Sequence, residues 1–180
     1  MVMGNAPAAA SSMRHGFEGP CELVATACAT GTHAIANAAR LIVQGRCDAM
    51  VAGSTEAAIT DTGIAGFRNM TALSSSGRSA PFDGERDGFV MSEGAGMLVL
   101  EEWEQAVARG ATILAEVLGG ASTADAHHIT APSPGGAGAI RCIRLALAEA
   151  GSEAGAIVQI NAHGTSTPRN DEAEAQAIAA

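Results

Sequence analysis

Aromatic side chains are nearly missing from this sequence of 180 residues: they make up 3% of it, and tyrosine does not occur. A core must therefore be built from aliphatic residues, and a hydrophobic fraction of 47% is enough to bury one. The formal net charge of −9 lacks the basic excess of nucleic-acid-binding proteins, so we expect no nucleic-acid partner. The length suits one sizeable domain or a fused pair of small ones.

Signatures of metal sites and membrane segments are missing too. The four cysteines form no CxxC pair and have no zinc-site spacing, so we expect no metal. No apolar run reaches the roughly 18 residues of a membrane span, and the N-terminus lacks the basic and apolar regions of a signal peptide. We therefore expect a cytoplasmic protein with reduced thiols and no membrane partner.

What is present is an alternation of short apolar runs and longer periodic stretches, which is typical of the α/β class. Strands are predicted at residues 23–26, 48–52, 112–123 and 156–161. Helices are predicted at residues 29–44, 101–110 and 137–150. The first strand, the first helix and the second strand together predict a βαβ unit with parallel strands.

The remaining stretches carry weaker signals. Residues 56–70 are predicted to be helix and loop, and the polar residues 71–88, with their charged "DGERDG", a solvated or salt-bridged surface loop. Two apolar runs within residues 89–102 form a hairpin-like pattern. Asp171 is predicted to be the N-cap of the last helix.

A cysteine stands at the junction of the first predicted strand and helix, in "LVATACATGTHAIANAARLI". The N-terminus of a helix favours an anion, and small neighbours would admit a substrate carbonyl to the sulfur of Cys28. Backbone N–H groups at such a turn can also hold an oxyanion. Free cysteines are just as commonly small buried residues, so local pattern leaves a nucleophile and a core residue equally open.

Among the histidines, His163 has the most suggestive setting, because its loop "NAHGTSTP" follows a predicted strand. It is able to exchange protons or stabilise an enolate, although a loop histidine satisfied by backbone groups is the commoner case. His33 lies five residues after Cys28 and is predicted to serve packing. The adjacent His127 and His128 are predicted to be loop residues rather than a metal pair.

Taken together, five stretches resemble the β-ketoacyl-acyl-carrier-protein synthases of the elongating type used in fatty acid synthesis. They are "GPCELVATACATGTHAI", "DAMVAGSTEA", "PFDGERDGFVMSEGAGMLVLEE", "DAHHITAPSP" and "NAHGTSTPRNDEAEAQAI". They occur in the order found in that family and cover nearly the whole sequence. The resemblance implies a thiolase-like α-β-α-β-α layered sandwich of two related halves, here residues 1–110 and 111–180, incomplete at both ends, in a homodimer.

The resemblance also implies roles for single residues. Cys28 is the nucleophile that receives the acyl group, and His163 is the first of two active-site histidines that assist malonyl decarboxylation. The other implied roles are pantetheine binding by Thr165 and Thr167, support of a catalytic lysine by Asp171 and Glu174, a mobile loop at Asp125, His128 and Thr130, and an acyl pocket at Phe67. The implied partner is acyl carrier protein, which brings the phosphopantetheine, so no cofactor of the protein's own is expected.

The implied activity is decarboxylative condensation of an acyl thioester with malonyl-acyl-carrier-protein. A ketosynthase of a polyketide pathway and a non-catalytic partner resembling a chain-length factor are the alternatives; the presence of both Cys28 and His163 speaks against the second. The family's "KSxxGHxxGAAG" segment and its later gating loop are absent, so we expect an internal piece of a longer protein that is inactive alone.

Overall fold

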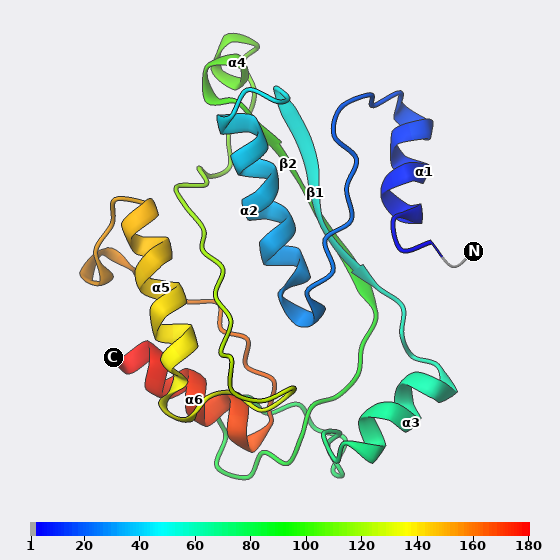
Figure 1. The fold of residues 1–180 in the computed structure, drawn as a ribbon, viewed down its shortest axis with the longest axis vertical. Coiled ribbons are helices and arrows are strands. Elements are labelled where there is room, and N and C mark those ends of the chain that lie inside the picture. Colours follow the sequence, from blue (N-terminus) through cyan, green and yellow to red (C-terminus); the bar gives the residue numbers. More distant parts are fainter. Residues whose placement is uncertain (1–2) are drawn as a thin grey trace. The chain divides into compact units, whose positions relative to one another are not determined.

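A computed structural model describes residues 3–180, in which helices accompany a two-stranded sheet (Figure 1). The chain folds as two compact units, each made of two separate stretches. The first unit holds the residues up to Thr55 together with Ala95–Val117, and the second holds Glu56–Gly94 together with Leu118–Ala180. No helix within residues 3–180 is long and apolar enough to cross a membrane.

The core of the first unit lies between helix α2 (Thr30–Val43) and strands β1 (Ala49–Glu56) and β2 (Gly94–Glu101), along which α2 runs in Figure 1. Apolar side chains three or four residues apart give α2 one buried face, as predicted. The packed residues are Ile35, Ala38, Ala39 and Ile42 of the helix and Met50, Ala52 and Leu100 of the strands. The helix ends at Gln44, before Gly45 at φ 65°, and its last carbonyls accept from the N–H groups of Gly45 and Arg46.

The two strands pair in antiparallel fashion, since the N–H of Glu102 donates to the carbonyl of Asp48 (2.9 Å) while Gly53 lies beside Gly96 and Met97. The predicted parallel βαβ unit, residues 23–26, 29–44 and 48–52, is wrong because its first strand does not form. Residues 23–26 form no strand, because a strand requires a hydrogen-bonded neighbour and none of the described residues supplies one.

Two further helices belong to the first unit. Helix α1 (Ala6–His15) was not predicted from the sequence; it ends at Gly16, whose N–H donates to the carbonyl of Ser12. Helix α4 (Trp103–Ala108) confirms the helix predicted at 101–110 with a shorter extent. Its N-cap is Glu102, whose carboxylate accepts from the N–H of Gln105 at 2.8 Å.

The second unit contains helices α3 (Asp61–Asn69), α5 (Ala137–Glu149) and α6 (Pro168–Ala179). Helix α5 confirms the helix predicted at 137–150. It begins directly after Gly136, which has φ 64° and lies against the carbonyl of Ala173 and the methyl group of Ala177. A side chain at Gly136 has no room, so this glycine permits the close contact of the two helices.

Helix α6 begins three residues before the predicted N-cap Asp171. Pro168 occupies the first turn, where a missing N–H costs nothing, and Thr167 is the N-cap in extended conformation. The prediction is wrong because it applied the capping preference of aspartate and overlooked the proline signal.

Three other strand predictions are also wrong. Residues 112–123 and 156–161 run without a paired neighbour among residues 3–180, and Leu114 and Val158 are 93% and 100% exposed. The hairpin-like pattern at 89–102 contains only β2, which pairs with β1, while Phe89 forms an isolated parallel bridge with Leu73. The apolar content of these segments was identified correctly, but their pairing was not.

Candidate functional site

Cys28 is the middle residue of a 3-10 turn, Ala27–Ala29, that leads directly into α2. The residue before it, Ala27, has φ 51°, in the left-handed region that costs an alanine about 1–2 kcal/mol. Cys28 is exposed. Of the two readings left open by the sequence, the small buried core residue is therefore excluded in this structure.

Two hydrogen bonds tie the cysteine turn to the first two turns of α2. The N–H of Thr26 donates to the hydroxyl of Thr30 (2.9 Å), and the hydroxyl of Thr26 lies 2.7 Å from Nδ1 of His33. His33 therefore has a polar role beyond the predicted packing. Its partner lies outside the helix, so helical spacing gave no signal of it.

A close approach of α2 to β1 also holds this turn in place. A Cβ on Gly31 would stand 2.9 Å from the hydroxyl of Ser54 on β1. Any side chain at position 31 would thus have to displace Ser54 or push the start of α2 away from the sheet.

In the second unit, His163 lies in an irregular stretch, residues 162–167, which we call the histidine loop. A carboxylate on α6 holds its backbone: Glu174 accepts from the N–H of His163 (2.6 Å) and from the N–H of Gly164 (2.8 Å). The His163 side chain is exposed. Glu174 thus acts on the histidine through the backbone, a contact that the sequence reading did not anticipate.

The two predicted pantetheine-binding residues lie side by side in the same loop. The hydroxyls of Thr165 and Thr167 are 2.8 Å apart, and we call them the threonine pair. Between them stands Ser166, fully buried and with φ 66°. This kink turns the side chain of Ser166 to the interior and leaves the threonine pair half-buried.

Asp171, on the first turn of α6, is also buried, with 1% of its surface exposed. Its carboxylate accepts from the N–H of Phe82 (2.8 Å) and from the side-chain amide of Asn170 (3.2 Å), and Arg86 Nε lies 3.5 Å away. The sequence contains no lysine. The predicted support of a catalytic lysine by Asp171 and Glu174 stays a prediction.

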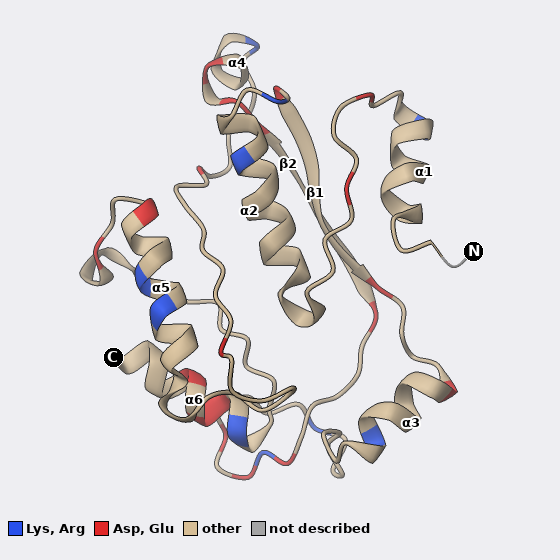
Figure 2. Ribbon diagram, in the orientation of Figure 1, with Lys and Arg blue, Asp and Glu red and all other residues tan. Residues whose placement is uncertain are grey.

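Charged residues gather on the loop after α3 and on the first turn of α6 (Figure 2). Within that loop, Asp87 is a group that the sequence reading missed. It accepts hydrogen bonds from the hydroxyls of Ser74, Ser75 and Ser76 and from the N–H groups of Ser75 and Ser76. These donors, Ser74 foremost, hold the pKa of Asp87 well below its usual value. The run of three serines was the available signal, but nothing local links it to an aspartate eleven residues on.

The remaining predicted residues occupy separate places in the second unit. Phe67 meets Phe89 edge-on, with ring centroids 5.0 Å apart. Asp125 accepts from the N–H of Ser133 (2.9 Å). Nδ1 of His128 accepts from the N–H groups of Thr130 (3.1 Å) and Ala131 (3.0 Å), so the ring nitrogen free to carry the proton is Nε2.

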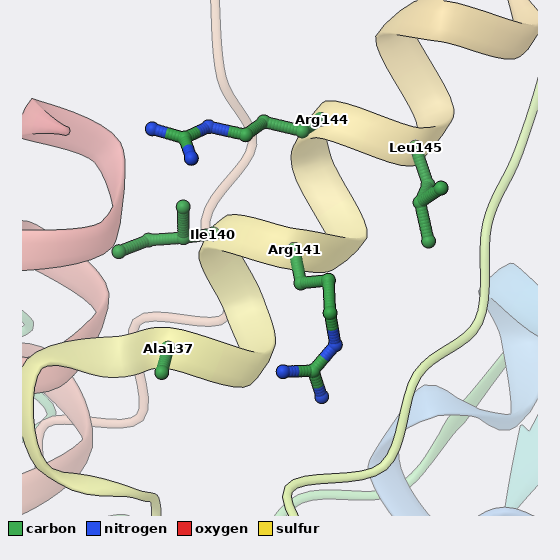
Figure 3. Close-up of a pocket in the computed structure, with 5 residues that line it drawn as sticks. All are labelled: Ala137, Ile140, Arg141, Arg144 and Leu145. Atoms are coloured by element: carbon green, nitrogen blue, oxygen red, sulfur yellow. The ribbon is translucent and has the colours of Figure 1, made fainter.

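A surface hollow of about 470 Å³ contains none of these residues. All five side chains that line it come from α5 (Figure 3). They are Ala137, Ile140, Arg141, Arg144 and Leu145. A hollow on one helix encloses no substrate, so the chemistry points instead to the cysteine turn and the histidine loop.

The second unit thus brings together His163, the threonine pair, Asp171 and Glu174, whereas Cys28 belongs to the first unit. Each half of the predicted site thus lies within one unit. No group of three or more potential metal-ligating side chains occurs in the part of the chain that the structure describes.

Comparison with known proteins agrees with the motifs. Family models for the N-terminal and C-terminal domains of β-ketoacyl synthase match residues 1–106 and 114–180. The chain is 49% identical to 3-oxoacyl-[acyl-carrier-protein] synthase 2 of Synechocystis sp., covering 99% of this chain and 44% of that protein. It is 53% identical to the synthase 2 of Rhizobium meliloti, covering 91% of this chain and 40% of that protein.

Solved structures agree as well. A ketosynthase in a type II polyketide complex with its acyl-carrier protein superposes with a TM-score of 0.92 at 39% identity, covering 94% of this chain and 43% of that one. The ishigamide ketosynthase/chain length factor gives 0.93 at 38% identity, covering 98% and 43%. The chain spans less than half the length of these relatives. The mixed α/β fold and the resemblance read from the motifs are confirmed, and the chain belongs to the β-ketoacyl synthase family.

Proposed function

We propose that the protein containing this chain is a 3-oxoacyl-acyl-carrier-protein synthase that extends acyl chains by two carbons in fatty acid elongation. The observation that carries this proposal is the cysteine turn: Cys28 is exposed at the start of α2, directly after the left-handed Ala27. About half of the residues are shared with synthases of that name.

The first half of the reaction is acyl transfer. The sulfur of Cys28 attacks the carbonyl carbon of an acyl thioester, and the carbon's bond to the phosphopantetheine sulfur breaks. The proton of the cysteine ends on the released carrier thiol. The N-terminus of α2 stabilises negative charge on the attacking sulfur, which is the reason for a thiol at this junction.

The second half is condensation. Malonyl-carrier loses CO2, and the electron pair of the broken carbon–carbon bond remains as an enolate, whose oxygen accepts a hydrogen bond from His163. The enolate carbon attacks the acyl carbonyl on Cys28, and the tetrahedral intermediate expels the sulfur, which takes up one proton. Phosphopantetheine arrives as part of the carrier substrate, and the threonine pair binds its arm.

The architecture proposed with this function is the thiolase-like layered sandwich, with residues 1–110 and 111–180 in its two related halves, in a homodimer. Acyl carrier protein is the proposed partner; the ketosynthase that superposes at a TM-score of 0.92 was solved in complex with such a carrier. Phe67, packed against Phe89, is proposed to border the acyl chain.

A polyketide ketosynthase is the second candidate, favoured by the superposition on ketosynthases of such pathways. Sequence identity separates the two: the fatty-acid-type synthases reach 49–53%, and the polyketide ketosynthase 39%. The fatty acid reading therefore comes first. Turnover with carriers from the two pathways distinguishes them.

The test uses the intact protein, radiolabelled acyl-carrier and the variants Cys28→Ala and Cys21→Ala. Both thiols are exposed, so the second variant is a matched control. We expect label on the wild type and on Cys21→Ala but none on Cys28→Ala. We also expect iodoacetamide to alkylate Cys28 faster than Cys21, because only Cys28 adjoins a helix N-terminus. Label on Cys28→Ala would refute the assignment of Cys28 as the nucleophile.

A further inference from the structure

A stretch of the second unit far from His163 in sequence holds the histidine loop in place. We call residues 80–88 the clamp segment. The N–H of Ala80 donates to the hydroxyl of Ser166 (2.9 Å), and the N–H of Gly88 donates to the carbonyl of the same serine (3.0 Å). The N–H of Phe82 donates to the Asp171 carboxylate (2.8 Å). Every one of these bonds joins residues more than 75 positions apart, so none belongs to a local turn.

Arg86 is the side chain at the centre of this contact. Its Nη2 donates to the carbonyl of Pro168 (2.8 Å) and its Nε to the carbonyl of Thr167 (3.4 Å). Nη1 donates to the carbonyl of Asp83 within the clamp segment (2.8 Å), and the Asp171 carboxylate lies 3.5 Å from Nε. The guanidinium is thus spread over three backbone carbonyls and one buried carboxylate, an arrangement that suits its planar set of donors.

The contact between the clamp segment and the histidine loop has two unfavourable features, so other interactions must compensate for them. A cation beside the N-terminus of α6 faces the positive end of the helix dipole, and Asp171 offsets it there. Phe82 and Ser166 both have positive φ, at 63° and 66°. Strained residues of this kind persist only where surrounding contacts over-determine them, and they gather at functional sites.

The contact of Arg86 with Thr167 connects the clamp to a functional pair. The carbonyl of Thr167 binds the arginine and the N–H of Asp171, while its hydroxyl lies 2.8 Å from that of Thr165. Fixing the Thr167 backbone therefore fixes where both hydroxyls point. We propose that Arg86 is a positioning residue that sets the threonine pair for the pantetheine arm of the carrier substrate; this inference rests on the function proposed above.

The experiment compares Arg86→Gln with Arg78→Gln in the intact protein. Arg78 is a matched control because it is an arginine of the same loop whose ion pair with Asp83 is exposed, with 59% and 44% of the two side chains accessible. Condensation is measured against the concentration of malonyl-carrier, and alkylation of Cys28 by iodoacetamide is measured in parallel. The rate at which iodoacetamide alkylates Cys28 does not depend on the threonine pair, so it reports separately on the cysteine turn.

For Arg86→Gln we expect KM for malonyl-carrier to rise about tenfold, the equivalent of one lost hydrogen bond to the arm. We expect kcat to change less than KM, and the alkylation rate of Cys28 to stay at the wild-type value. Arg78→Gln should leave all three unchanged. Arg86→Lys, which keeps the charge but loses the planar fork, should raise KM about threefold and serves as the test if Arg86→Gln does not fold.

The outcomes separate this inference from the function beneath it. If the wild type is active and Arg86→Gln has the same KM as Arg78→Gln, the positioning role alone is overturned. If only the lysine variant folds, an equal KM in Arg86→Lys and the wild type has the same consequence. A parallel loss of kcat and of Cys28 alkylation shows general structural damage and also overturns it. A wild type that releases no carrier thiol and forms no 3-oxoacyl product overturns the proposed function, and this inference with it.

Discussion

Glu174→Gln removes one of the two acceptors that hold the backbone beside His163. In the wild type, one carboxylate oxygen takes the N–H of His163 and the other takes the N–H of Gly164. A glutamine side chain has a single carbonyl oxygen, so its NH2 group must face one of these donors. The change thus loses a charge-assisted hydrogen bond, makes the second one neutral and sets a donor against a donor.

The magnitude follows from those bonds. A hydrogen bond to a charged group contributes about 1.5–3 kcal/mol, and half-burial of Glu174 favours the lower part of that range, so we take about 2 kcal/mol. An opening free energy lowered by about 2 kcal/mol corresponds to roughly 30-fold faster exchange of the protected amides. The amides of His163 and Gly164 report it, and amide hydrogen exchange measured by NMR is the assay.

Glu172→Gln is the control, because Glu172 is exposed on the same helix and carries the same charge. Its carboxylate accepts a long hydrogen bond from the side-chain amide of Gln176, at 3.5 Å, and contacts neither amide of the histidine loop. We expect wild-type exchange at His163 and Gly164 in this variant. If the two glutamine variants exchange alike at both amides, the carboxylate of Glu174 does not hold the loop, and the reasoning is refuted.

Two further predictions concern the scaffold. In Asp87→Asn, the amide shifts of Ser75 and Ser76 should lose their acid dependence; in the wild type the lowered pKa of Asp87 keeps the serine bonds intact above the ordinary aspartate value of about 3.9, and they break only as pH falls below it. An NMR titration that shows the wild-type bonds failing above pH 5 would contradict this. Gly53→Ala should lower the free energy of unfolding in urea by about 1–3 kcal/mol, because a Cβ there meets the carbonyl of Gly96. An unchanged urea midpoint would contradict this and show that the β1–β2 pair accommodates the methyl group.

Helices α2, α4 and α5 were predictable from the sequence because the signal of each is contained in one stretch of chain, whereas α1 was missed. The three- and four-residue spacing of Ile35, Ala38 and Ile42 fixes both the existence and the buried face of α2, and Gly45 marks its end. Among the strands only the prediction at 48–52 is confirmed, by β1, since an apolar run becomes a strand only when a neighbour pairs with it. Val158 shows the difference: it belongs to an apolar run, yet it has no ladder partner among residues 3–180.

The candidate site divides in the same way. The motif around Cys28 predicts a strand-to-helix junction; its position before α2 is confirmed, although residues 23–26 form no strand. The contacts of Arg86 and Asp171 were not predictable, because they join residues 81–89 positions apart, and the local rule assigned Asp171 to a helix cap instead. Residue types indicated the chemistry, whereas only the fold shows which side chains hold the loop in place.

The clamp segment also bears on how the family's two domains depend on each other. Residues 80–88 lie within the stretch matched by the N-terminal domain model, whereas the histidine loop lies within the stretch matched by the C-terminal one. In the structure both belong to the second compact unit. Ser166 and Asp171 are almost completely buried, and the clamp segment supplies donors to both. Without it these polar groups would lose partners at a cost of about 1–3 kcal/mol each, so the loop that carries His163 takes its shape from residues of the other sequence domain.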